Sequence, residues 1–178
     1  GEVTFSPGQY MIVHVPGIDN VIRRSYSISS HSSDRTHFEI CVRAVSGGFC
    51  SNFIHRLRPG DCIQVEGPYG DFRLDDGSQR DILMIATGTG IAPIKSMLLS
   101  LLGKTGTRRI RLFFGLRNVS DLFYVNLLSD LKETHPWFEP TIILSQPDPM
   151  GWSGLRGRVT DLIDEQVSTD EASNTDAY

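Results

Sequence analysis

The sequence predicts a two-part fold, in which a small antiparallel β barrel or sandwich precedes an α/β domain with a parallel sheet. Residues 1 to about 74 contain short strand-like runs separated by Gly- and Pro-containing turns, a pattern typical of small barrels and sandwiches. After residues 75–80, continuous apolar runs alternate with helical segments, which is typical of a parallel sheet buried on both faces. We therefore expect two domains, at residues 1–76 and 77–178.

The first domain is expected to contain four strands and one short helix. Turn signals (PG, SSDR, SGG and RPGD) separate the strands. The helix SNFIHRL, at residues 51–57, has Ser51 as its expected N-cap. The strands are expected at residues 10–15, 24–29, 37–45 and 61–67.

The second domain is expected to alternate strands and helices after the linker DDGSQR. Its strands DILMIA, RIRLFFG and TIILS are expected at residues 81–86, 109–115 and 141–145. Its helices are expected at residues 91–102, 120–133 and 159–167. The final DEASNTDAY is either a disordered polar tail or the start of another strand.

The composition excludes several classes of protein. A hydrophobic fraction of 39% and a charged fraction of 21% are typical of a globular protein, and the net charge of -4 argues against nucleic acid as the main partner. Three widely spaced cysteines form neither a disulfide framework nor a CxxC metal pair, which favours a reduced, cytoplasmic setting. No apolar run approaches the ~18 residues of a membrane span.

The segment GTGIAPIKS, residues 88–96, links a buried strand to a helix. Gly88 and Gly90 permit a tight turn and close approach of a ligand, and Pro93 suits the first turn of a helix. Free backbone N–H groups and the helix dipole then favour a phosphate. The segment departs from GxGxxG because Pro93 replaces the third glycine, and alone it could equally be a structural turn.

Two further segments contain residues that are suited to bind an anion or a flat aromatic ring. In RRSYSISS, residues 23–30, strand geometry places Arg24, Tyr26 and Ile28 on one face. A guanidinium beside an aromatic ring suits a flat ligand that carries a pyrophosphate, although an exposed Arg next to a packed Tyr is the simpler interpretation. In GGFCSNF, residues 47–53, glycines again precede a polar residue and a short helix.

These segments together resemble the ferredoxin–NADP reductase family. PGQY, RSYS, GFCSNF, GPYGDF, GTGIAP, FGLRN, DLFY and WSGLRGRV follow one another in the family's order over nearly the whole chain. The resemblance implies a Greek-key flavin-binding barrel followed by a nicotinamide-binding α/β domain. It also implies that the chain is an excised piece, because the family's first barrel strand and its last Cys-Gly-Pro-like strand are not present.

The resemblance implies roles for individual residues. Arg24 would bind the flavin pyrophosphate, Tyr26 would lie against the flavin ring, and Ser27 would approach flavin N5, with Ser25 beside them. The flavin phosphate loop would be Gly48, Phe49, Cys50 and Ser51. The nicotinamide cofactor would be held by Thr87, Gly88, Thr89, Gly90, Ile91, Ala92, Pro93, Gly115, Arg117, Ser145 and Gln146.

The expected function is a flavin-dependent NAD(P)H oxidoreductase that resembles the reductase components of oxygenases. Hydride would pass from nicotinamide to FAD, and electrons would then pass to a [2Fe-2S] domain or another acceptor outside this chain, which lacks a CxxxxCxxC motif. FMN is the alternative flavin. Gln146 stands where NADP-using relatives commonly have an arginine, so NADH is expected over NADPH. A free flavin reductase and a nucleotide-binding regulatory module without turnover are the alternative functions.

Overall fold

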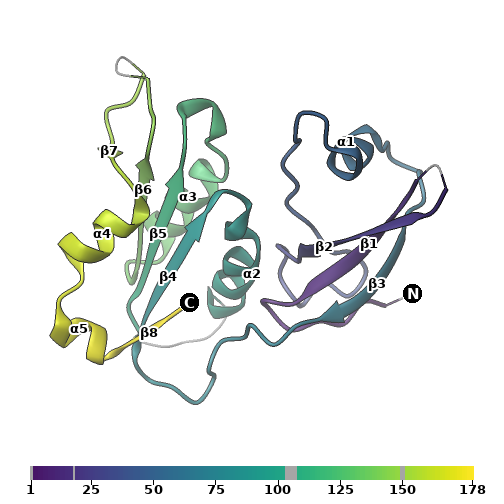
Figure 1. Cartoon of the computed structure of the whole chain (residues 1–178). Coiled ribbons are helices and arrows are strands. Elements are labelled where there is room, and N and C mark those ends of the chain that lie inside the picture. The colour runs from purple at the N-terminus through teal and green to yellow at the C-terminus, as the bar shows by residue number, and fades with distance from the viewer. Residues whose placement is uncertain (1, 18, 103–107, 149–150) are drawn as a thin grey trace.

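The computed structural model describes residues 2–17, 19–102, 108–148 and 151–178. The described residues form two sheets, one of three strands and one of five (Figure 1). The smaller sheet is built from the first part of the chain, and the larger sheet from residues after Asp81. Residues 75–80 therefore lie between the last strand of the smaller sheet and the first strand of the larger one.

The smaller sheet is antiparallel, in the order β2-β1-β3. Its strands are β1 (Tyr10–Pro16), β2 (Val21–Ser27) and β3 (Gln64–Tyr69). Alternate residues of β1 point into the domain, so that Met11, Val13 and Val15 are buried while their neighbours are partly exposed. This alternation is the period that distinguishes a half-buried antiparallel strand from the buried strands of the second domain.

The prediction of a strand at residues 37–45 is wrong. The regular part of the first domain is the three-stranded sheet. Within this segment the backbone makes one bridge, between Ile28 and Ile40. Its other hydrogen bonds are isolated: Glu39 N–H donates to Ser30 Oγ, Glu39 O accepts from Ser29 N–H, and Val42 O lies 2.8 Å from His55 Nε2. The segment follows β2 without forming a regular ladder.

The short helix of the first domain is α1 (Phe49–Arg56), which begins two residues earlier than predicted. Gly48 is the N-cap, so the prediction of Ser51 as N-cap is wrong. Ser51 lies inside the first turn, where its hydroxyl donates to Gly48 O and accepts from Val45 N–H. The serine therefore stabilises the loop that leads into the helix.

The larger sheet is parallel throughout, in the order β7-β6-β5-β4-β8. Its central strands have continuous apolar sequences because helices cover both of their faces. Phe113 and Phe114, adjacent on β5, are both fully buried, one under each face. The strands are β4 (Asp81–Thr87), β5 (Ile110–Leu116), β6 (Phe138–Leu144), β7 (Leu155–Arg156) and β8 (Thr175–Ala177).

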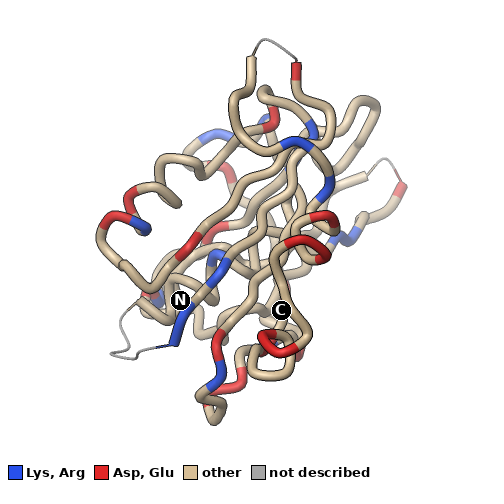
Figure 2. Tube along the Cα trace, turned by 90° about the vertical axis from the view of Figure 1, so that its left-hand side faces the viewer, with Lys and Arg blue, Asp and Glu red and all other residues tan. Residues whose placement is uncertain are grey.

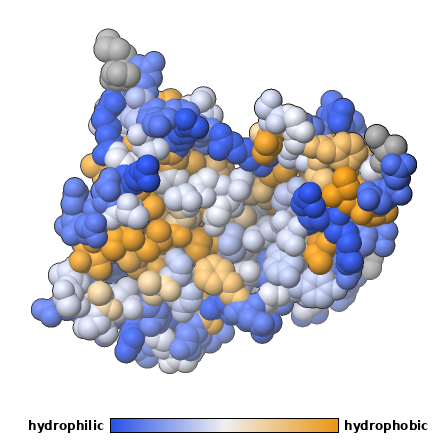
Figure 3. Space-filling view, viewed as in Figure 1, coloured by the Kyte–Doolittle hydropathy of each residue, from blue (hydrophilic) through white to orange (hydrophobic). Residues whose placement is uncertain are grey.

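Helices cover the two faces of this sheet unequally. The helices α2 (Ile91–Leu102) and α3 (Val125–Thr134) pack on one face, and α4 (Val159–Gln166) packs on the other. A band of hydrophobic side chains is visible on the surface near α4 (Figure 3). A short helix, α5 (Thr169–Ser173), leads from α4 to β8.

Two boundaries in the second domain differ from the prediction. The helix expected from residue 120 begins at Val125, because Val119–Asp121 forms a separate 3-10 turn (η2) and Tyr124 has a left-handed backbone with φ of 59°. The C-terminal residues form α5 and β8, and β8 pairs with β4. The interpretation of DAY as strand is confirmed, and the disordered tail is wrong.

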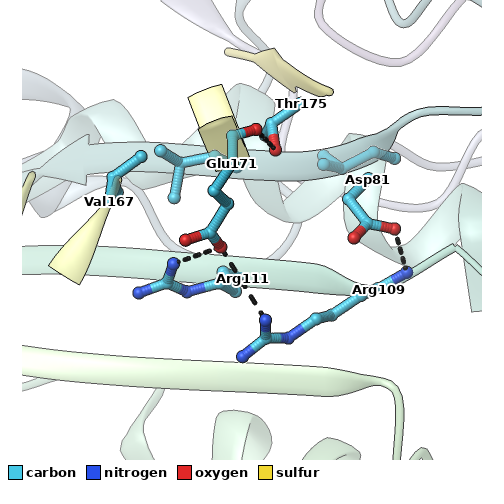
Figure 4. A pocket seen from close by; sticks show the side chains of 8 residues that line it. Asp81, Arg109, Arg111, Val167, Glu171 and Thr175 are labelled. Carbon is cyan, nitrogen blue, oxygen red and sulfur yellow. Dashed lines mark hydrogen bonds and ion pairs between the residues drawn. The ribbon is translucent and has the colours of Figure 1, made fainter. Parts of the chain in front are cut away.

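An ion-pair cluster closes the sheet at the amino ends of its strands (Figure 4). Glu171 on α5 lies 2.6 Å from Arg111 and 3.7 Å from Arg109, and Arg109 N–H donates to Asp81. The cavity between these side chains holds about 10 Å³, room for about one water molecule. The cluster therefore ties α5 and β8 to the sheet and leaves no space there for an organic ligand.

Charged side chains of both signs are interspersed along the described trace (Figure 2). No helix in the described part of the chain is long and apolar enough to cross a membrane.

The first domain packs against α2 at Gly8, so we expect a substitution of Gly8 to destabilise the protein. Gly8 has a φ of +98°, and a Cβ there would overlap the Phe72 carbonyl oxygen and crowd the Met97 methyl group. Gly60 has the same φ of +98° but has no atom within 4 Å of its would-be Cβ. We expect Gly60→Ala to cost on the order of 1–3 kcal/mol for backbone strain alone.

Gly8→Ala should lower the free energy of unfolding by clearly more than Gly60→Ala, because it adds a steric clash to the same strain. Urea denaturation of both variants measures the difference. Equal losses of stability would mean that Gly8 is not packed against Phe72 and Met97.

Candidate functional site: a cleft at the carboxyl edge of the parallel sheet

A cleft of about 970 Å³ lies at the carboxyl ends of the strands of the larger sheet. Thr87 at the end of β4, Gly115 and Leu116 at the end of β5, and Ser145 just after β6 contribute to its wall. In open parallel sheets, ligands bind outside the carboxyl ends of the strands. The cleft therefore has the position and the size of a cofactor site.

The glycine turn predicted from GTGIAP lies at this edge. Gly88–Gly90 forms a 3-10 turn (η1) between β4 and α2, and Gly88 has a φ of +51°. A Cβ built on Gly88 or Gly90 would meet no atom within 4 Å, so the turn faces open space. The turn can therefore present backbone N–H groups to a ligand that approaches closely.

The structure brings most of the predicted nicotinamide-site residues to this cleft. Those that line it are Thr87, Gly88, Thr89, Gly115, Arg117, Ser145 and Gln146. The remaining predicted residues are not in its lining. Ile91 and Ala92 are buried at the start of α2, and Gly90 and Pro93 complete the turn and the first helical turn.

Sequence reasoning did not identify about half of the lining. The additional residues are Arg43, Leu116, Asp121, Gly157, Arg158, Val159, Thr160 and Asp161. Residues 157–161 surround the start of α4, which a Gly-Arg-Val pattern could have indicated as a third turn at the same edge. Arg43 comes from the first domain, and no signal local to its sequence indicates that it reaches this cleft.

Two arginines in the cleft are each held by a polar partner. Arg117 Nε donates to Gln146 Oε1 at 2.7 Å, across the loops that follow β5 and β6. Arg43 lies 3.3 Å from Asp121, so a cation of the first domain pairs with an anion of the second domain inside the cleft. Backbone bonds fix the floor, because Ser145 N–H donates to Leu116 O and Gln146 N–H donates to Arg117 O.

The RSYS strand packs beside α1. Tyr26 packs in a cluster with Val13, Val15 and Cys50, the last from the first turn of α1. Burial raises the pKa of the Tyr26 hydroxyl, Cys50 raises it further, and Arg24 acts in the opposite direction. The predicted strand and the predicted loop therefore lie side by side, with Arg24 exposed next to Tyr26.

The other residues of the predicted flavin site have different surroundings. Ser25 is exposed opposite Ile12, and Ser27 pairs with Tyr10, on the face of β2 away from Tyr26 by strand alternation. Phe49, Cys50 and Ser51 form the first turn of α1, and their backbone N–H groups precede the first helical bond, which Asn52 N–H donates to Gly48 O. Three adjacent N–H groups at a helix start can bind an anion.

Comparison with known proteins assigns the two domains to families. Residues 1–74 match the oxidoreductase FAD-binding domain, and residues 84–178 match the oxidoreductase NAD-binding domain. The chain belongs to the FAD- and NAD-binding oxidoreductases of the ferredoxin–NADP reductase type. It carries an FAD-binding domain of this family followed by an NAD-binding domain.

Similar proteins include reductases of several systems. The chain is 39% identical over 159 residues to the reductase component DmpP of phenol 2-monooxygenase from Pseudomonas sp. (strain CF600), covering 88% of this chain and 44% of that protein. It is 35% identical over 161 residues to ferredoxin–NADP reductase B from Sorangium cellulosum (strain So ce56), covering 90% and 66%. The chain thus spans between about two fifths and two thirds of these relatives.

A solved structure has the same arrangement of the two domains. The Amycolatopsis cytochrome P450 reductase GcoB superposes with a TM-score of 0.85 at 28% identity, over 99% of this chain and 53% of that one. The fold of a small antiparallel sheet domain followed by a parallel-sheet domain is therefore the fold of this reductase family.

Proposed function

We propose that the chain is the NADH-oxidising part of a flavoprotein that passes electrons to an acceptor outside this chain. The observation that carries the proposal is the pair of anion sites, one in each domain, with a third group, Arg43, reaching from the first domain into the cleft of the second. The two cofactors supply the transfer of a hydride, which is two electrons with one proton, from nicotinamide to flavin. The protein supplies binding, orientation and electrostatics.

In the proposed nicotinamide site, the turn Gly88–Gly90 holds the pyrophosphate through backbone N–H groups, supported by the start of α2. Thr87, Thr89, Gly115 and Ser145 form the floor. The cleft volume of about 970 Å³ suits a dinucleotide, because ligand clefts typically hold ~300–1,000 Å³. Ile91, Ala92 and Pro93 support the turn from beneath without lining the cleft.

In the proposed flavin site, Arg24 binds the pyrophosphate of FAD and Tyr26 supports the flavin ring. The first-turn N–H groups of Phe49, Cys50 and Ser51 bind the same phosphates, and Gly48 keeps the loop compact because a Cβ there would lie 2.7 Å from Ser51 Oγ. The Ser51 hydroxyl is engaged by the loop backbone, so we assign its role to the N–H group. Ser27, at the end of β2, is proposed to lie near flavin N5, with Ser25 beside it.

The proposed acceptor is a [2Fe-2S] domain or protein, as in oxygenase reductase systems. The similarity to the phenol 2-monooxygenase reductase component supports this choice over a free flavin reductase. A cytoplasmic setting is proposed because Cys41, Cys50 and Cys62 are all unpaired thiols. Mass spectrometry of the cofactor released from the purified protein tests the proposal: FAD is expected, and a colourless protein that FAD cannot reconstitute would contradict it.

Arg24 generates a prediction about flavin retention. A charge-assisted hydrogen bond to a phosphate contributes about 1.5–3 kcal/mol, against about 0.5–1.5 kcal/mol for a neutral one. Arg24→Ala should therefore weaken FAD binding by roughly tenfold more than Ser27→Ala does. Fluorescence titration of the two apoproteins with FAD measures both dissociation constants. Equal constants would reject the assignment of Arg24.

The loop after β6 generates a prediction about cofactor preference. Gln146 is neutral and Asp148 is acidic, which disfavours the extra phosphate of NADPH, whereas Arg117 in the same cleft would favour it. We expect a moderate preference for NADH. Steady-state dye reduction, comparing kcat/KM for the two cofactors, measures it, and a tenfold preference for NADPH, about 1.4 kcal/mol, would contradict it.

The Gln146→Arg variant should shift the ratio toward NADPH, because it places a cation beside the expected ribose position. Gln79→Arg adds the same charge on the exposed linker and should leave the ratio unchanged. No shift in Gln146→Arg would show that the ribose does not lie beside residue 146.

A further inference from the structure

The helix α2 lies on the side of the larger sheet that is nearer to the smaller sheet (Figure 1), and three of its consecutive residues contact the first domain. Lys95 Nζ lies 2.7 Å from Glu39 Oε2. Ser96 is fully buried, and its hydroxyl donates to Ser30 O at 2.7 Å. Met97 is fully buried and packs against Gly8.

Tyr124 joins the same contact from the start of α3. Lys95 Nζ lies 4.8 Å from the centre of its ring. Burial raises the pKa of the Cys41 thiol, and the Tyr124 hydroxyl and Lys95 act in the opposite direction. The φ of 59° at Tyr124 is rare for a bulky residue and costs about 1–2 kcal/mol. Such a conformation persists where the surroundings determine it, and these are often functional positions.

We call Glu39, Cys41, Lys95 and Tyr124 the coupling cluster. Two of its members come from each domain. The Lys95 side chain is only 12% exposed, whereas the Glu39 side chain is 62% exposed. An ion pair and a cation–ring contact therefore meet at Lys95, which is the desolvated member of the cluster. A charged group from which water is largely excluded depends on its partners, so Lys95 is the member whose loss should matter most.

Three of the four members of the coupling cluster, and the nearby Ser30, lie a short distance along the chain from a residue of a proposed cofactor site. Cys41 precedes Arg43 by two residues, and Tyr124 follows Asp121 by three. Lys95 lies on the helix that begins directly after the Gly88–Gly90 turn. Ser30, the partner of Ser96, follows the RSYS strand by three residues.

We propose that the coupling cluster is a positioning device that sets the spacing between the flavin site and the nicotinamide site. Its members act through the residues that they hold and do not touch either cofactor. The inference rests on the proposed function, because spacing matters only if the two sites exchange electrons. A misplacement of about 1 Å between reacting groups can slow a reaction about 100-fold.

The alternative is that the coupling cluster only adds stability. The two accounts differ in which constant changes. A positioning device, when removed, lowers the rate constant of flavin reduction at saturating NADH and leaves the NADH dissociation constant nearly unchanged. A stabilising contact, when removed, lowers the free energy of unfolding and leaves both constants unchanged in the folded protein.

The experiment compares Lys95→Met with Lys95→Arg in the flavin-loaded protein. The methionine variant loses the ion pair and the ring contact, whereas arginine can restore both. Lys132→Met, on the exposed side of α3, removes the same charge as a control. Anaerobic stopped-flow absorbance gives the rate constant and the dissociation constant, and amide hydrogen exchange reports the interface without any turnover.

Lys95→Met should reduce the limiting rate at least tenfold, and raise amide exchange in residues 38–43 and 122–125 but not in β4 and β5. Lys95→Arg and Lys132→Met should match the wild type. If exchange rises while the limiting rate stays at the wild-type value, the positioning role is wrong. If neither amide exchange nor the limiting rate changes, Lys95 does not hold the two domains together.

A second variant guards against misfolding. Tyr124→Phe keeps the ring beneath Lys95 and removes only the hydroxyl that acts on the Cys41 thiol, and it should lower the limiting rate without lowering NADH affinity. An unchanged rate in Tyr124→Phe would show that Cys41 does not help to set the spacing between the two sites. If the wild-type protein itself is not reduced by NADH or NADPH, the proposed function fails, whereas a normal wild type with an equally fast Lys95→Met rejects only the positioning role.

Discussion

A parallel sheet must be covered on both faces, and this constraint places the cleft of the larger domain. The chain satisfies it with α2 and α3 on one face and α4 on the other. Each connection from strand to helix then falls at the same edge, so the turns after β4, β5 and β6 surround one space. The opposite edge is free to be closed by the Arg111–Glu171 cluster, which holds α5 and β8 in place.

The placement of α2 links this sheet to the first domain. One side of the helix is buried on the sheet through Ile94 and Leu98, and Ser96 is buried against the first domain. The turn at its start belongs to the proposed nicotinamide site. A single helix therefore fixes the phosphate-binding turn relative to both domains, and the Arg43–Asp121 pair spans the domains again within the cleft.

Local sequence patterns predicted the elements that depend on local causes. The continuous apolar runs of β4 and β5 and the glycine turn before α2 are of this kind, as is the place of Arg24 beside Tyr26. The patterns failed where distant partners decide the outcome. Residues 37–45 have strand-like composition, but their backbone groups bond to Ser30 and His55 side chains. Arg43 reaches the cleft only because the domains pack as they do. The predicted helix at residues 120–133 starts late, at Val125, because the surroundings of Tyr124 hold an unfavourable backbone conformation.

The central claim is that a flavin in the first domain accepts electrons from a nicotinamide in the second. Anaerobic titration of the purified flavoprotein with NADH, followed by absorbance in the flavin band, tests it most directly. The account predicts that the band bleaches in proportion to the added NADH, and that air restores it. A protein that carries flavin but keeps its full absorbance under excess NADH and excess NADPH would contradict the account.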